Sequence, residues 1–238
     1  MSDANQSADS YVAAGLEQAQ DGQFDTAIAF FHKAIDLDAN YVSAYYHLGN
    51  VLMNLGQLDE AIDNYTRTIE IDSKHAFAFY NRGNAYDANG DSPTAIEDYT
   101  RALMLMPDLT NALNNRGIVY GKLGEHEQAI KDFTTVIEHD SDHVLAYNNR
   151  GEVYFQQGNY ASALADFKKA NDIQPGHLMF IAGQAVTHHA LGEDDAAANL
   201  WRLLVGQDER YLDAGWVGEQ LNWAIELIDQ AHTLIESF

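Results

Sequence analysis

Four rows of residues keep a period of 34 along the chain. The rows begin with glycines, continue with a second set of glycines seven residues later, and end with alanines and aromatic residues. They are Gly15, Gly49, Gly83, Gly117, Gly151; Gly22, Gly56, Gly90, Gly124, Gly158, Gly192; Ala27, Ala61, Ala95, Ala129, Ala163, Ala197; and Phe31, Tyr65, Tyr99, Phe133, Phe167, Trp201. A fixed period of this length indicates stacked supersecondary units, each touching only its neighbours, instead of one globular core.

One period, residues 42–75, predicts two helices joined by a short turn. The apolar residues of the first helix recur three and four positions apart: Tyr45, Leu48, Gly49 and Leu52. Gly56 ends this helix, because glycine adopts the left-handed conformation needed just past a helix end. The second stripe is Ala61, Ile62, Tyr65 and Ile69. Each unit is therefore expected to be a helical hairpin, in which Gly49 and Ala61 let the two helices approach closely.

The order of these positions resembles the tetratricopeptide repeat family. The fullest match is Tyr147, Gly151, Tyr154, Gly158, Ala163, Phe167, Ala170 and Pro175. The resemblance covers residues 8–211 as six repeats: 8–41, 42–75, 76–109, 110–143, 144–177 and a degenerate 178–211, where Ala185 replaces the usual glycine. It implies an all-α, right-handed superhelical solenoid of helix-turn-helix repeats. It also implies a concave groove lined by the first helices, and a role in binding proteins or peptides without catalysis.

The two ends of the chain depart from the repeat. Residues 1–7 are polar and are expected to be a disordered tail. Residues 212–238 are expected to cap the solenoid, with one long helix over about 216–236. Its apolar surface is broader than a cap needs, and it carries Trp216 and Trp223. A contact with a second chain, giving a homo-oligomer, or with the chain's own groove therefore stays open beside simple capping.

Arginine and aspartate occur in the same repeats, and where one is missing the other is missing too. Arginines precede the glycine in three repeats, and an aspartate follows each of them by sixteen residues: Arg82 with Asp98, Arg116 with Asp132, and Arg150 with Asp166. The first two repeats lack both residues. This pattern predicts structural ion pairs between the helices of a hairpin. A row of arginines that binds an anionic ligand is the alternative, but it would not require matched aspartates.

The first-helix positions that should face the groove are mostly asparagine and tyrosine. They are Tyr46, His47, Asn50, Tyr80, Asn81, Asn84, Asn114, Asn115, Asn148 and Asn149. Asparagine is a poor helix former, so helix propensity does not explain its use here. Its amide offers a donor and an acceptor together, which match those of a peptide bond. A row of such amides is predicted to hold an extended polypeptide by its main chain.

A structural role for these asparagines competes with peptide binding. The amides could bond to each other and to neighbouring groups, and so tie adjacent repeats together. The basic clamp by which some relatives grip a terminal carboxylate is missing, because Tyr46, Tyr80 and Asn114 stand at those positions. The predicted ligand is a neutral to basic, extended protein or peptide segment. Its affinity should be about micromolar, since ordering a flexible peptide offsets much of the contact energy.

Composition and charge exclude several classes of function. The formal net charge is −23, which disfavours nucleic acid and anionic membrane surfaces, because both repel an acidic chain. No apolar stretch approaches the length of a membrane helix, so no membrane insertion is expected. Cysteine is absent, and the first residues lack the pattern of a signal peptide. These features favour a cytoplasmic location.

No pattern in the sequence indicates catalysis. His188 and His189 are adjacent, so they point to different faces of a helix and cannot chelate a metal as a pair one turn apart would. Phosphate-binding glycine loops and dinucleotide fingerprints are absent from the sequence, and the periodic glycines have a structural explanation. No cofactor, metal site or catalytic residue is expected. The leading hypothesis is an interaction scaffold or adaptor, and the competing one is a self-assembling solenoid that oligomerises through the C-terminal helix or the repeat ends.

Overall fold

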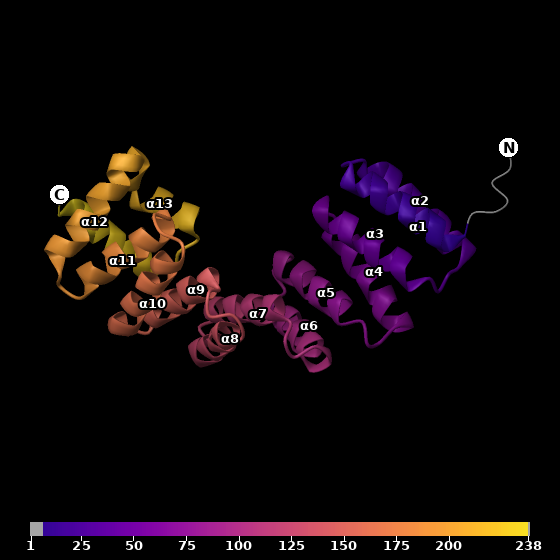
Figure 1. Ribbon diagram of the computed structural model, residues 1–238, viewed down its shortest axis with the longest axis horizontal. Helices are drawn as coiled ribbons and strands as arrows, with labels where there is room; N and C mark the ends of the chain where they lie inside the picture. The colour runs from indigo at the N-terminus through magenta and orange to yellow at the C-terminus, as the bar shows by residue number, and fades with distance from the viewer. Residues whose placement is uncertain (1–6, 238) are drawn as a thin grey trace. The chain divides into compact units, whose positions relative to one another are not determined.

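The computed structural model describes residues 7–237, and every regular element in that range is helical (Figure 1). The all-α fold and the repetition of helical hairpins are thereby confirmed. The chain forms two compact units, one ending at Arg116 and the other beginning at Gly117. Most of the expected disordered tail, residues 1–7, lies outside the described residues. Ser7 is the exception, because its hydroxyl accepts a bond from the backbone N–H of Ser10 at 3.3 Å and caps the first helix.

The first unit is built from consecutive helical hairpins. Its helices are α1 (Ala8–Gln20), α2 (Phe24–Leu37), α3 (Val42–Asn54), α4 (Leu58–Ile71), α5 (Ala76–Ala88), α6 (Ser92–Leu105) and the first part of α7 (Thr110–Lys122). Within each hairpin the two helices pack together, and the second helix also packs against the first helix of the following hairpin. The first helices α1, α3 and α5 therefore lie next to one another along one side of the unit.

The second unit continues this pattern from Gly117 onward. After the rest of α7 its elements are α8 (His126–His139), α9 (Val144–Gln156), α10 (Tyr160–Ile173), α11 (Leu178–Ala190), α12 (Asp194–Gln207), the 3-10 turn η1 (Glu209–Leu212), α13 (Ala214–Leu221) and α14 (Ile225–Glu236). Glycines with φ between +72° and +83° stand at the turns inside the hairpins of both units, as the second glycine row predicted.

The first glycine row lies at tight contacts between the two helices of the first five hairpins. A Cβ added at Gly49 would lie 2.7 Å from the ring of Tyr65, and one at Gly83 would lie 2.8 Å from the ring of Tyr99. Both rings are almost completely buried, so neither can move aside without a shift of its surroundings. The period of 34 thus pairs each helical glycine with the aromatic ring sixteen residues later.

Gly49→Ala should lower the free energy of unfolding by about 1–3 kcal/mol, because the added methyl group overpacks the contact with Tyr65. Gly206→Ala is a matched control inside a helix, since its Cβ would meet nothing within 4 Å. That control should be stabilising by about 0.5–1 kcal/mol, because alanine favours the helix. Urea unfolding of both variants measures the difference. Equal effects of the two substitutions would contradict the steric explanation.

The expectation of one long C-terminal helix is wrong. The chain instead forms two helices, α13 and α14, which fold back on each other. Asn222 ends α13 in the left-handed conformation, with φ 51° and ψ 44°. Asparagine tolerates this conformation better than other residues with a side chain. The two helices cross closely at Gly218, where an added Cβ would lie 2.5 Å from Ile228.

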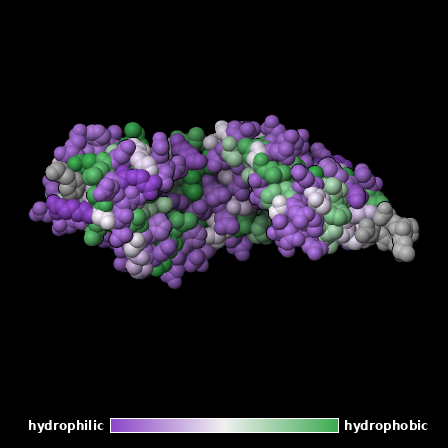
Figure 2. Space-filling view, turned by 90° about the horizontal axis from the view of Figure 1, so that it is seen from above, coloured by the Kyte–Doolittle hydropathy of each residue, from purple (hydrophilic) through white to green (hydrophobic). Residues whose placement is uncertain are grey.

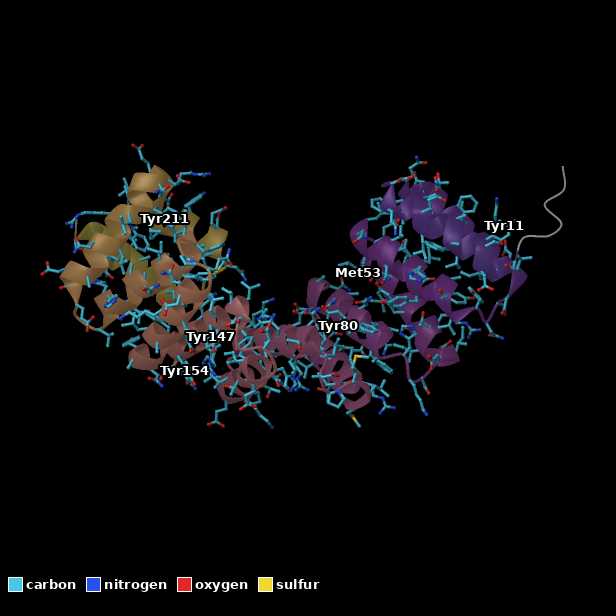
Figure 3. All side chains as sticks on the ribbon, viewed as in Figure 1. Tyr11, Met53, Tyr80, Tyr147, Tyr154 and Tyr211 are labelled. Atoms are coloured by element: carbon cyan, nitrogen blue, oxygen red, sulfur yellow. The ribbon has the colours of Figure 1, made fainter. Side chains whose placement is uncertain are left out.

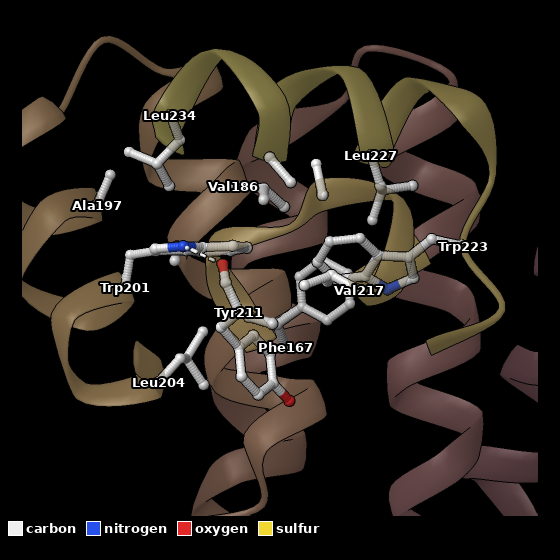
Figure 4. Packing of buried hydrophobic residues seen from close by; sticks show 14 of the residues in the cluster. Phe167, Val186, Ala197, Trp201, Leu204, Tyr211, Val217, Trp223, Leu227 and Leu234 are labelled. Atoms are coloured by element: carbon white, nitrogen blue, oxygen red, sulfur yellow. Dashed lines mark hydrogen bonds between the residues drawn. The ribbon is translucent and has the colours of Figure 1, made fainter. Parts of the chain in front are cut away.

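The C-terminal hairpin completes the core of the second unit. Trp201 of α12 is fully buried, and its indole N–H donates to the backbone oxygen of Tyr211 at 3.0 Å (Figure 4). Leu227 and Leu234 of α14 and Trp223 of the preceding segment join the same cluster. Trp223 is therefore buried within this unit, as capping requires, whereas Trp216 is only partly buried and Ile225 is exposed.

A chain ending at Leu212 should lose the stability of its second unit, because it lacks the buried residues Trp223, Leu227 and Leu234. Each such side chain contributes about 1.5–3 kcal/mol when buried. We expect the shortened chain to exchange the amide hydrogens of α11 and α12 much faster and to aggregate, as measured by mass spectrometry and light scattering. A change from a stable dimer to an equally stable monomer would instead show that the hairpin is an assembly contact.

Candidate functional site

Asparagine amides join successive repeats on the first-helix side of the first unit. The Nδ2 of Asn81 on α5 donates to the Oδ1 of Asn50 on α3 at 2.9 Å and to the hydroxyl of Tyr46 at 3.1 Å. The same Oδ1 of Asn50 accepts a bond from the hydroxyl of Tyr65 on α4, also at 2.9 Å. One amide oxygen therefore holds together three helices of two repeats.

The same arrangement recurs one repeat later. Asn115 on α7 donates to the Oδ1 of Asn84 at 2.9 Å and to the hydroxyl of Tyr80 at 3.3 Å. The hydroxyl of Tyr99 also donates to Asn84, at 2.9 Å. Tyr80, labelled in Figure 3, lies on α5 together with Asn84. Both networks thus follow the period of 34.

Burial keeps the tyrosines of these networks in their neutral, donating form. Desolvation raises the pKa of the Tyr65 and Tyr99 hydroxyls well above the ordinary tyrosine value. Each hydroxyl therefore remains a donor to its asparagine throughout the physiological range. The sequence left two roles open for these asparagines, joining repeats and binding a peptide. The bonds between repeats use one polar atom of each amide, either its oxygen or its nitrogen.

The second polar atom of three of these side-chain amides is not used in the bonds between repeats. Within residues 7–237, the Nδ2 of Asn50, the Nδ2 of Asn84 and the Oδ1 of Asn81 form no hydrogen bond. All three side chains line a hollow of about 210 Å³ between α3 and α5, together with Met53, Asn54 and Tyr65. The hollow of the first unit is therefore lined by residues that carry two free amide donors and one free amide acceptor.

His47, the remaining candidate on α3, lies among aromatic rings. Its ring stacks on Phe31 with centroids 6.2 Å apart, and meets Tyr46 edge-on at 5.2 Å. Burial lowers the pKa of His47 below the ordinary histidine value, and the nearby His75 lowers it further. His47 is therefore neutral at pH 7, and it packs against Phe31 of the preceding repeat without lining the hollow.

Asn114 of the fourth repeat and the two candidate asparagines of the fifth repeat are placed differently. Asn114 donates to its neighbour Asn115 at 3.4 Å, and Asn148 donates to Asn149 at 3.4 Å. Asn148 is only 2% exposed, and it also donates to the Oε1 of Glu152 at 2.7 Å. The sequence pattern gave no sign of Glu152, because the other repeats hold no glutamate at its position.

Arg82 and Asp98 form a bidentate ion pair inside their hairpin. The Nε of Arg82 donates to Oδ2 of Asp98 at 2.7 Å, and Nη2 donates to Oδ1 at 2.9 Å. Arg150 and Asp166 repeat this geometry at 2.8 Å and 2.9 Å. The hydrogen bonds to Asp98 raise the pKa of Arg82 above its already high ordinary value. Both arginines are therefore paired with an aspartate inside their own repeat.

Each arginine also bonds to a threonine that the sequence reading missed. Nη1 of Arg82 donates to Thr66 at 2.9 Å, Nη1 of Arg116 to Thr100 at 2.9 Å, and Nη1 of Arg150 to Thr134 at 3.0 Å. The three threonines stand 34 residues apart, sixteen positions before the arginines. This spacing was visible in the sequence and could have revealed the full motif.

The second unit contains a separate pocket of about 550 Å³. Its lining comes from the end of α7, the start of α8, α9, Met179 of α11 and the segment that joins α13 to α14. Asn148, Asn149 and Glu152 are among the residues that line it. Among residues 7–237 no group of three or more histidine, aspartate or glutamate side chains could hold a metal ion. None of the helices in that range is long and apolar enough to cross a bilayer.

Family models agree with this architecture over most of the chain. Models described as tetratricopeptide repeat match residues 76–109 and 114–177, and a model described as TPR repeat matches residues 15–56 and 49–90. The chain belongs to the tetratricopeptide repeat family, whose fold is generally a non-catalytic scaffold for protein–protein interaction. The comparison with curated proteins gave no match.

Solved structures of repeat proteins are similar to this chain. The structure titled "Crystal structure of MamA protein" is 29% identical, with a TM-score of 0.66, over 70% of this chain and 91% of that chain. YrrB, described as a TPR protein with an unusual peptide-binding site, is 28% identical, with a TM-score of 0.65, over 72% and 89%. A tetratricopeptide repeat protein from Parabacteroides merdae shares the fold at 21% identity and a TM-score of 0.73, over 98% and 100%.

Proposed function

We propose that this chain is a scaffold or adaptor that holds an extended segment of a partner protein against the first-helix side of its first unit. The observation that supports this most is the unused half of each amide at Asn50, Asn81 and Asn84. The bound half of each amide fixes its orientation. A ligand that bonds to the free half therefore meets a preorganised group, which lowers the entropy cost of binding.

The free groups match the main chain of an extended peptide. Asn50 and Asn84 each present an N–H donor to a peptide carbonyl, and Asn81 presents an oxygen to a peptide N–H. Main-chain recognition of this kind depends little on the ligand's side chains. Met53 adds an apolar, adaptable contact at the edge of the hollow. The proposed ligand is thus defined by its extended conformation more than by its sequence.

Charge supports a neutral to basic ligand. The chain carries a formal net charge of −23, and hydrophilic residues cover much of the visible surface (Figure 2). An acidic surface attracts a basic segment and repels an acidic one. The likeness to YrrB, whose title mentions a peptide-binding site, supports the same class of ligand. We place the protein in the cytoplasm, since a chain without cysteine fits a reducing compartment.

The test replaces Asn50 and Asn84 with aspartate and measures capture of random peptides of about ten residues displayed on phage. Aspartate keeps the oxygen that accepts from Tyr65 and Asn81, but it removes the free donor. The repeats should therefore stay joined while peptide capture falls by about tenfold or more. Circular dichroism of the double variant checks that its helical content is unchanged.

Asn64→Asp supplies the matched control, because it makes the same chemical change on α4 at a residue that does not line the hollow. Its Nδ2 bonds to the backbone oxygen of Glu60 within the same helix. The control variant should capture peptides as the natural chain does. Equal capture by all three proteins would remove the proposed role of the asparagines.

A further inference from the structure

The pocket of the second unit contains polar atoms that the fold leaves without partners. Three side-chain atoms within residues 7–237 are buried without a hydrogen bond: Nδ1 of His126, Oδ1 of Asn148 and Nε1 of Trp223. All three residues line this one pocket. Buried polar groups are nearly always bonded, so three unbonded ones around one cavity indicate a place for a polar ligand or ordered water.

Glu152 adds a partly buried carboxyl group to the same pocket. Among the described residues its hydrogen-bond donor is Asn148, and no arginine or lysine forms an ion pair with it. Burial raises the pKa of Glu152 to about 8, far above the ordinary value for glutamate. A carboxylate without a cation is costly in such surroundings, and a cation supplied by a ligand would remove that cost.

The two acceptors are close together because one amide connects them. The Nδ2 of Asn148 donates to Glu152, and the Oδ1 of the same amide is the unbonded atom. A primary ammonium group has three donors and a full positive charge, so it can bond to both oxygens at once. Ile118, Leu145, Val153 and Met179 supply apolar walls for an alkyl stem.

We propose that this pocket binds a primary alkylammonium group through Glu152 and Asn148, with the stem packed against the apolar walls. This site is separate from the asparagine face of the first unit. Two sources share the required chemistry: a free alkylamine, and the side chain of a lysine. Trp223, which lines the pocket, has an unbonded indole N–H, which suits a carbonyl on the lysine-containing ligand.

The other charged groups of the pocket do not replace the ligand. Lys122 at the end of α7 and Glu226 on α14 are both exposed and carry opposite charges. His126 at the start of α8 is the remaining titratable residue in the lining, and α11 contributes Met179, which is uncharged. Glu152 is thus less exposed than Glu226, the other carboxylate of the lining, and binding a cation to it must displace its proton at pH 7.

The test uses the full chain and titrates it calorimetrically with n-pentylamine and with N-acetyl-lysine methylamide. Both should bind at pH 7 and release close to one proton to the buffer, detected by comparing buffers of different ionisation enthalpy. In nitrogen-15 NMR spectra the indole signal of Trp223, assigned with Trp223→Phe, should shift on binding. Tighter binding of the lysine derivative assigns the site to a protein side chain, and tighter binding of pentylamine assigns it to a free amine.

Glu152→Gln should weaken amine binding by about tenfold or more and abolish the proton release, while keeping the bond from Asn148. Glu219→Gln on the exposed surface of α13 removes the same charge outside the pocket and should leave binding unchanged. The proposal is overturned if pentanoate binds in place of pentylamine. It is also overturned if Glu152→Gln binds amines as well as the natural chain, or if no probe binds and the cavity holds water only.

Discussion

Arg82→Ala should lower the free energy of unfolding by about 3–5 kcal/mol. The substitution leaves the carboxylate of Asp98 buried, with 5% exposure, and without the two bonds that Arg82 now donates. It also removes the bond to Thr66. A buried charge without a partner is among the most costly defects in a folded protein. Chemical denaturation monitored by circular dichroism measures the loss.

Two further variants distinguish the effect of breaking a buried ion pair from the effect of removing an arginine charge anywhere in the unit. Arg67→Ala breaks an exposed ion pair with Glu70 in the same unit, and should change the stability far less than Arg82→Ala does, because solvent screens exposed charges. Arg82→Met combined with Asp98→Leu removes both charges together and should restore most of the lost stability. Peptide capture should be preserved in the folded Arg82 variants. An unchanged stability of Arg82→Ala, accompanied by lost binding, would show that the arginine serves a ligand instead.

Glu152→Gln should stabilise the chain at alkaline pH and have little effect near pH 4.5. Burial raises the pKa of Glu152 to about 8 in the folded protein, from 4.5 for an unperturbed glutamate. Between these values the folded chain holds a proton that the unfolded chain releases. The stabilising effect of the protonated form is therefore complete below about pH 4.5, and it is lost as the pH rises toward 8.

Glutamine is neutral at every pH, so the variant should lack this part of the pH dependence. The difference in unfolding free energy between the variant and the natural chain should grow by at most about 1.4 kcal/mol per pH unit over this window. Urea unfolding from about pH 5 to about pH 9 measures it, with Glu219→Gln as the control for net charge. A difference that stays constant with pH would contradict a raised pKa at Glu152.

Most of the architecture could be predicted because it repeats. In the first five hairpins the glycine of the first helix and the aromatic ring sixteen residues later form one contact, so the same spacing recurs from repeat to repeat. The arginine and aspartate rows were visible for the same reason, since a bond inside the hairpin keeps its spacing from repeat to repeat. Thr66 belongs to such a row as well, but its hydroxyl carries no charge that would have suggested a partner.

The features that do not repeat could not be predicted from the sequence. Asn222 breaks the C-terminal segment into two helices without a proline or glycine at that position, because a single asparagine takes the left-handed conformation. Glu152 and His126 occur once in the repeat register, so no pattern linked them. The division of each asparagine amide into a bonded half and a free half depends on hydrogen-bond geometry that no spacing encodes.

The most direct measurement of peptide binding follows the side-chain amide signals of the chain by nitrogen-15 NMR while a captured basic peptide is added. The Nδ2 groups of Asn50 and Asn84 should shift strongly, because they are the free donors. The Nδ2 groups of Asn81 and Asn115 should shift much less, because they remain bonded within the repeats. If the signals of Asn50 and Asn84 stay in place at saturating peptide, these amides do not hold the partner's main chain.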